Sequence, residues 1–148
     1  MSEERLRAVE ITRLGQGQYE ATNPRGGRLV FGRGDDDEAF TPVELLLTAL
    51  AGCMAIDVDY ITAKRAEAER FIVSIGAEKI RDEQGNRLVD IRLSLDVGFP
   101  QTDAGEAADA VLPSAVQRSR DRICTVGRTV AVGTPVETEV VGHDVTAG

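Results

Sequence analysis

Apolar and polar residues alternate over the first third of the chain, and this alternation predicts short β-strands. Residues 9–12 alternate clearly before a glycine-containing turn, and residues 18–22 are expected to return as a second strand. A second turn signal rich in Asn, Pro and Gly precedes the apolar residues 29–31. We therefore expect three strands here. Residues 32–38 follow as an exposed acidic loop, for which solvation is a simpler explanation than a metal site.

A long helix is predicted from residue 42, because its start carries complete capping signals. Thr41 is a suitable N-cap, Pro42 suits the first helical position, and Glu44 completes a T-x-x-E capping box. No further proline occurs up to residue 68, so we expect a helix over residues 42–68. Its first half is apolar on every face, which predicts a helix that is buried on all sides. Its second half is amphipathic and is expected to reach solvent.

The middle of the chain predicts a β-hairpin followed by a second helix. Apolar residues alternate over residues 71–81 and again over residues 88–97, on either side of a polar turn that contains glycine. A helix is then expected over about residues 104–123. Pro113 lies inside this range and is expected to kink the helix or to divide it in two.

The last part of the chain is expected to close the fold with two strands. Residues 126–132 and 135–141 are rich in valine and threonine, residue types that are typical of strands. The predicted order is then β-β-β-α-β-β-α-β-β, which is an α+β pattern. No repeat or linker divides the sequence, so we expect one domain over residues 1–148.

Charge and terminal sequence indicate a cytoplasmic protein without a nucleic-acid or membrane partner. The net charge is −8 and the pI is near 4.7, whereas nucleic acids and anionic membranes attract basic surfaces. The N-terminal residues include acidic side chains and no apolar core of a signal peptide. The longest mainly apolar stretch, residues 43–56, is too short for a membrane span.

Candidate chemistry is concentrated in two cysteines, Cys53 and Cys124. The chain has one histidine, His143, and no CxxC or HxxxH spacing, so we expect no closed zinc site, no metal and no cofactor. Cys53 lies in the apolar helix, where a small buried thiol is an alternative to a reactive one. Asp57, one helical turn later, is expected to pair with an arginine or to mark where the helix meets water. Three arginines precede Cys124; they either favour a thiolate or complement a helix C-terminus.

Two motifs resemble the signatures of the OsmC/Ohr superfamily. Residues 41–53, T-P-V-E-L-L-L-T-A-L-A-G-C, resemble the first signature, in which a proline opens the central helix and a cysteine follows eleven residues later. Residues 119–126, S-R-D-R-I-C-T-V, are similar to the second signature, in which another reactive cysteine precedes a final strand. The resemblance spans about residues 5–142. It implies an OsmC-like α+β fold, with two antiparallel β-sheets wrapped around long central helices in an intertwined homodimer.

The resemblance also implies thiol-based reduction of organic hydroperoxides in an oxidative-stress response. Cys53 would be the peroxidatic residue, attacking the hydroperoxide as a thiolate and becoming a sulfenic acid. Cys124 would be the resolving residue, condensing with that sulfenic acid to form a disulfide. A dithiol reductant would then reopen the disulfide.

The sequence departs from the well-characterised enzymes of the family, which place a glutamate and an arginine beside the peroxidatic cysteine. The glutamate position falls at Val43, and Glu44 points to the helix face opposite Cys53. The arginine is expected from the first strands, where Arg13 is a candidate cation partner. Three further arginines compete for that role: Arg25, Arg28 and Arg33. The missing glutamate leaves an alternative, a weakly catalytic or non-catalytic binding module for a small apolar or thiol-bearing ligand.

Overall fold

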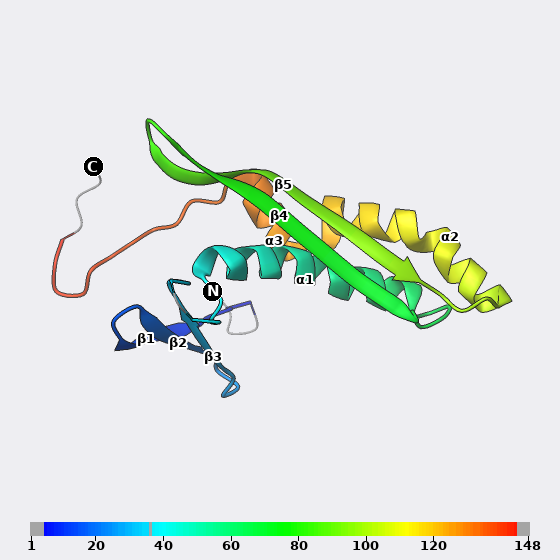
Figure 1. Ribbon diagram of the computed structural model, residues 1–148, viewed down its shortest axis with the longest axis horizontal. Coiled ribbons are helices and arrows are strands. Elements are labelled where there is room, and N and C mark those ends of the chain that lie inside the picture. The colour runs from blue at the N-terminus through cyan, green and yellow to red at the C-terminus, as the bar shows by residue number, and fades with distance from the viewer. Residues whose placement is uncertain (1–4, 36, 145–148) are drawn as a thin grey trace. The chain divides into compact units, whose positions relative to one another are not determined.

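The structure, a computed structural model, describes residues 5–35 and 37–144. Its strands and helices follow one another in the mixed order of an α+β protein (Figure 1). The elements are β1 (Glu10–Gly15), β2 (Gln18–Thr22), β3 (Arg28–Gly32), α1 (Pro42–Thr62), β4 (Arg70–Asp82), β5 (Gly85–Gly98), α2 (Asp103–Arg118), the π-helical segment η1 (Ser119–Ile123) and α3 (Thr125–Val132). The predicted class, the first three strands, the central helix and the hairpin are confirmed.

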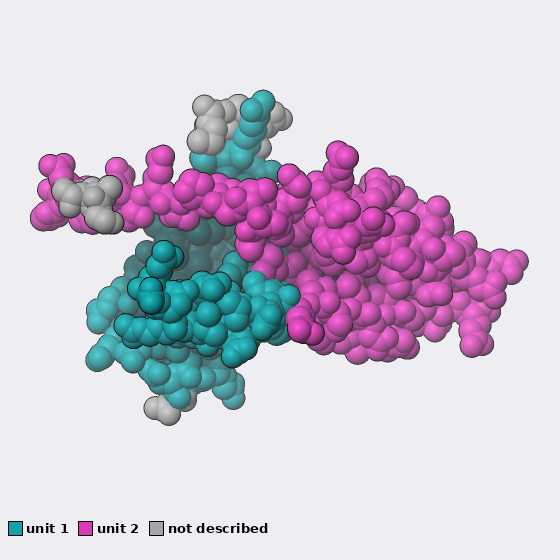
Figure 2. Space-filling view, turned by 90° about the horizontal axis from the view of Figure 1, so that it is seen from above, with its two compact units in different colours: residues 1–49, 75–91 teal, residues 50–74, 92–148 magenta. Residues whose placement is uncertain are grey.

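The chain divides into two compact units (Figure 2). Unit 1 comprises the chain up to residue 49 together with residues 75–91, and holds β1 to β3, the start of α1 and the turn of the hairpin. Unit 2 comprises residues 50–74 and the chain from residue 92 onward. It holds the rest of α1, the open end of the hairpin, α2, η1 and α3.

The N-terminal strands form one antiparallel sheet in the order β1-β2-β3. Alternating side chains bring Tyr19 of β2 opposite Phe31 of β3, and their rings stack with centroids 5.7 Å apart. The turn between these two strands is held by Asn23, whose Oδ1 accepts hydrogen bonds from the backbone N–H groups of Arg25 and Gly27. Phe31 is the buried apolar residue of this sheet.

The capping box predicted for α1 is confirmed. The Glu44 backbone N–H donates to Thr41 Oγ1 at 3.2 Å, and the Thr41 N–H donates to Glu44 Oε1 at 3.0 Å. The helix ends at Thr62, so the expectation that it continues to residue 68 is wrong. The chain has to be extended by Glu69, because the N–H of this residue donates to the Gly98 carbonyl at the end of β5.

The expectation that α1 is buried on all sides is also wrong for the single chain. Only three of its 21 residues are buried: Ala51, Val58 and Thr62. Ile56, which ends the apolar first half, is 73% exposed, and Tyr60, in the second half, is 70% exposed. The apolar surface of α1 therefore exceeds what this chain covers by itself.

Among the described residues, α1 is also the one helix with the length and composition needed to cross a membrane, with a mean hydropathy of 1.6 over its most apolar 18-residue window. The expectation that no apolar stretch is long enough rested on residues 43–56 and is wrong as far as length is concerned. The core helix of a soluble protein passes the same test, so length and composition carry little weight alone.

The predicted hairpin consists of β4 and β5, which form a two-stranded sheet. Exposed and partly buried residues alternate along β4, as the apolar pattern predicts. Arg70 and Asp96 join the open end of the hairpin by an ion pair of 2.8 Å. At the turn, Asp82 accepts hydrogen bonds from the Gln84 N–H and from Arg87 Nε.

Pro113 neither divides α2 nor ends it, contrary to one of the two outcomes expected for this residue. A proline cannot donate to the carbonyl four residues earlier, which belongs to Asp109, and this residue is exposed to solvent. The regular helix instead gives way at Ser119, where the five-residue π-helical segment η1 begins. The Cys124 N–H closes this segment by donating to the Ser119 carbonyl at 2.8 Å.

The expected closing strand pair is wrong. Residues 125–132 form the helix α3, and residues 135–139 belong to no strand or helix; one isolated bridge joins Val140 to His143. Cys124 caps the start of α3. Gly133 ends the helix in the left-handed conformation (φ 66°), and its N–H donates hydrogen bonds to the carbonyls of Thr129 and Val130. These local caps outweigh the strand preference of the β-branched residues between them.

Candidate functional site

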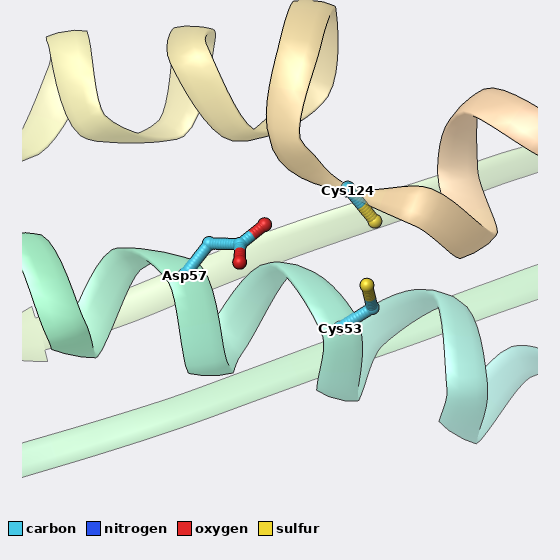
Figure 3. Close-up of side chains that lie close together, drawn as sticks. All are labelled: Cys53, Asp57 and Cys124. Atoms are coloured by element: carbon cyan, nitrogen blue, oxygen red, sulfur yellow. The ribbon is translucent and has the colours of Figure 1, made fainter. Parts of the chain in front are cut away.

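Cys53, Asp57 and Cys124 come together in unit 2 (Figure 3). The two sulfurs and one carboxylate oxygen of Asp57 all lie within 4.8 Å of one another. Cys53 and Asp57 project from one face of α1 because they are one helical turn apart. Cys124 lies at the junction of η1 and α3, and Figure 3 shows the two sulfurs turned toward one another. Both thiols are free.

The π-helical segment determines where the Cys124 side chain lies. After the Cys124 N–H has bonded to the Ser119 carbonyl, Cys124 itself is extended (φ −66°, ψ 101°) and becomes the N-cap of α3. Its Sγ accepts a hydrogen bond of 3.2 Å from the Gly127 N–H. Cys124 is only 2% exposed, whereas Cys53 is half-buried. The tertiary fold thus brings the more accessible thiol next to the buried one.

Ser119 joins α1 to η1 through the site. Its hydroxyl donates to Asp57 Oδ2 at 2.8 Å, and its side chain is fully buried. Asp57 was expected to pair with an arginine or to meet water; it is half-buried and accepts its hydrogen bond from this hydroxyl. Ser119 was not predicted as a site residue. It opens the segment that resembles the second family motif, but the spacing of that motif could not give it this role, which depends on a residue in a distant helix.

Burial raises the pKa of the Cys124 thiol, and hydrogen bonding with Cys53 raises that pKa further. The Gly127 N–H opposes this effect, while the charges of Cys53 and Asp57 add to it. None of the three arginines that precede Cys124 is among the groups that shift its pKa. Arg120 instead pairs with the neighbouring Asp121 at 3.1 Å. Cys124 is therefore held as a neutral thiol at neutral pH.

The four arginines considered as partners of Cys53 all lie in unit 1, whereas Cys53 lies in unit 2. Arg13 is on β1, opposite Tyr19. Arg28 and Arg33 form exposed ion pairs with Glu20 and Asp35. The role of Arg13 as a cation partner stays a prediction.

Comparison with known proteins identifies one family. A model of the OsmC-like protein family matches residues 34–139. An uncharacterised protein of Mycobacterium tuberculosis is 33% identical over 132 residues, which cover 88% of this chain and 93% of that protein.

Solved structures show the same fold at low sequence identity. An OsmC-like protein of Mycoplasma pneumoniae aligns with a TM-score of 0.66 at 13% identity, over 86% of this chain and 89% of its own. An organic hydroperoxide resistance protein OsmC of Legionella pneumophila aligns with a TM-score of 0.57 at 14% identity, over 87% and 91% of the two chains. The OsmC-like fold, with two antiparallel sheets and helices, is thereby confirmed.

The two thiols should differ in reactivity toward iodoacetamide. In the reduced native protein at neutral pH, Cys53 is expected to be alkylated before Cys124, because Cys124 is buried and its raised pKa leaves little reactive thiolate. Raising the pH through the folded pKa of Cys124 should increase the thiolate fraction at that site. Peptide mass spectrometry would measure both rates, and urea-denatured protein, in which the difference should largely vanish, is the control. Faster labelling of Cys124 at neutral pH would contradict the assignment.

Proposed function

The chain belongs to the OsmC-like family, and from this premise we propose that it is a thiol-dependent peroxide reductase acting on organic hydroperoxides in an oxidative-stress response. The observation that carries the proposal is the approach of two free thiols, Cys53 and Cys124, from separate elements of unit 2. The name of the Legionella relative, an organic hydroperoxide resistance protein, agrees with this chemistry.

The reaction uses the two thiols as a two-electron donor. The Cys53 thiolate attacks the outer oxygen of the hydroperoxide, the O–O bond breaks, and the alkoxide leaves as an alcohol after taking a proton. Cys53 is then a sulfenic acid. Cys124 attacks its sulfur, a disulfide forms, and the hydroxyl leaves as water with the thiol proton. Two thiols and one hydroperoxide thus yield one disulfide, one alcohol and one water, and a dithiol reductant restores the thiols.

Burial and protonation support this order of attack. Cys53 is the more exposed thiol, so a hydroperoxide reaches it first. Cys124 is buried with a raised pKa, which suits a residue that reacts only after the sulfenic acid has formed beside it. A disulfide needs sulfurs about 2.05 Å apart. In the reduced protein the two sulfurs are at most 4.8 Å apart, so they have to approach one another only a short way to form the disulfide.

The apolar neighbours of Cys53 on α1 favour an organic hydroperoxide over hydrogen peroxide. Leu50 precedes it by nearly one turn, and Ile56 follows by the same distance, so that both border its face of the helix. An alkyl or aryl group gains free energy by covering such surface, whereas hydrogen peroxide offers no apolar part.

A second candidate function, a weakly catalytic or non-catalytic binding module for a small apolar or thiol-bearing ligand, is favoured by the electrostatics of the site. Asp57 is the charged side chain that the described structure places beside the thiols, and a negative charge disfavours a thiolate. By the resemblance of residues 41–53 to the first family motif, Val43 falls at the position of the family glutamate. Glu44, its neighbour, is engaged in the capping box.

The proposal includes a cytoplasmic homodimer. The apolar face of α1 that one chain leaves exposed, including Ile56 and Tyr60, is what a second copy would cover. Acidic charge and free cysteines agree with a reducing compartment. The reductant would be a dithiol of that compartment.

Cumene hydroperoxide tests the peroxidase. One equivalent should remove both titratable thiols from the reduced parent, and dithiothreitol should support turnover. Cys53→Ser should lower the rate of peroxide consumption by at least about a hundredfold, because the nucleophile is lost. Cys124→Ser should consume one equivalent and then stop, with a sulfenic acid that dimedone traps. Two thiols that stay titratable while the peroxide persists would refute the proposal.

The binding-module alternative predicts a different pattern in the same proteins. Turnover should be absent, and a small apolar ligand should raise the melting temperature of the parent and of Cys53→Ser equally. Differential scanning fluorimetry with cumyl alcohol, the product of the peroxide above, measures this. Rapid turnover by the parent would exclude the alternative.

Sedimentation equilibrium tests the homodimer. The parent is expected at twice the chain mass of 15.9 kDa. Ile56→Lys should weaken association, because it places a charge in the face of α1 that a second chain would cover. A parent that remains at the single-chain mass at micromolar concentrations would contradict this part of the proposal.

A further inference from the structure

The thiol site also has the composition of a metal site, and we propose that the reduced protein binds a divalent ion of the zinc class through Cys53, Asp57 and Cys124. Their ligand atoms lie within 4.8 Å of one another. Around a tetrahedral zinc ion with Zn–S bonds of about 2.3 Å, ligand atoms are about 3.8 Å apart. A contraction of at most about 1 Å would therefore bring all three ligands onto one ion.

The ligands come from positions that suit metal binding. Cys53 and Asp57 are four residues apart on α1, and this spacing places two ligands on one face of a helix, as in helical zinc motifs. Cys124 approaches from the junction of η1 and α3. Three protein ligands leave a fourth tetrahedral position for water or another small ligand.

Hydrogen bonds outside the ligand set already orient two of the three ligands. Ser119 donates to Asp57 Oδ2 at 2.8 Å and leaves Oδ1 available to a metal. The Gly127 N–H donates to Cys124 Sγ at 3.2 Å, a bond that supports a thiolate. Outer partners of this kind fix the orientation of metal ligands and raise affinity. Ser119 is fully buried, so this support does not depend on a mobile surface side chain.

A divalent cation also explains the carboxylate. In a site that only formed thiolates, Asp57 would be an unfavourable like charge. Two thiolates and one carboxylate carry three negative charges, which a divalent ion largely neutralises. The soft thiolates favour zinc over magnesium or calcium, which prefer oxygen ligands.

Metal binding and disulfide formation use the same sulfurs and so exclude one another. Hydroperoxide and two protons would convert the metal-bound dithiolate into the disulfide, an alcohol, water and the free divalent ion. This release on oxidation rests on the proposed function, whereas metal binding by the reduced protein does not.

Cobalt(II) is the probe for the site. Titration of the reduced, metal-free full-length protein under anaerobic conditions should yield one equivalent of bound cobalt, with thiolate-to-cobalt charge-transfer absorption and the visible bands of a tetrahedral ion. Zinc should displace it. A parent that shows no such bands, or binds cobalt no more tightly than Cys53→Ser, would overturn the proposal.

Asp57→Asn is the decisive variant, and Asp59→Asn is its matched control. Asp59 is an exposed carboxylate on the same helix, so both variants remove one negative charge. Asp57→Asn should weaken cobalt binding by about tenfold or more, and Ser119→Ala by about tenfold, while Asp59→Asn should bind like the parent. Equal affinity in Asp57→Asn and Asp59→Asn would overturn the three-ligand site.

Two measurements keep this result distinct from misfolding and from the peroxidase. Circular dichroism and a titre of two free thiols establish that Asp57→Asn is folded and reduced. If Asp57→Asn is not folded, the cobalt affinity of Ser119→Ala tests the site instead. An affinity equal to that of the parent would then overturn the proposed support of Asp57 by Ser119. Peroxide consumption by metal-free Asp57→Asn is measured separately. Weakened cobalt binding by folded Asp57→Asn would support a metal role for Asp57 whatever the peroxidase rate of that variant, because the two measurements are independent.

Discussion

The hydrogen bond from the buried Ser119 hydroxyl to the Asp57 carboxylate joins the two elements on which the site depends. Ser119 also accepts the Cys124 N–H through its backbone carbonyl, so one residue positions both the carboxylate and the second thiol. A hydrogen bond to a charged group stabilises a fold by about 1.5–3 kcal/mol, and leaving either partner unpaired in a buried position costs a similar amount. Among the side-chain hydrogen bonds of the described residues, this contact links η1 directly to α1, and the thiols of Cys53 and Cys124 meet beside it.

The same contact gives the site two opposing electrostatic properties. It keeps a carboxylate beside two thiols. Burial and hydrogen bonding with Cys53 raise the pKa of Cys124 and keep it protonated, and the charge of Asp57 adds to this effect. Such an environment suits a resolving thiol that reacts late. It is a poor environment for a pair of free thiolates, and a divalent ion is the natural means of compensating the charge. The redox and metal chemistries therefore follow from one arrangement of three side chains and would alternate with the oxidation state of the sulfurs.

Much of the fold follows from local patterns. Alternation predicted β1 and the hairpin, because a strand with one buried face needs apolar residues at every second position, and turn signals delimited β2 and β3. The capping box predicted the start of α1, because its donors and acceptors lie within four residues. Local patterns failed where two local preferences compete. Valine and threonine after Cys124 favoured strands, but a cap at each end of residues 125–132 makes them a helix.

For the site, the sequence by itself determined the two cysteines, their resemblance to family motifs and the placement of Asp57 on the Cys53 face of α1, since a helix has a known period. Tertiary structure alone decided that Cys124 meets this face and that Ser119, not an arginine, binds Asp57. It also decided that the apolar helix is largely uncovered by its own chain. These features depend on contacts between residues far apart in the sequence. Residue spacing predicts only which side chains share a face within one helix or strand.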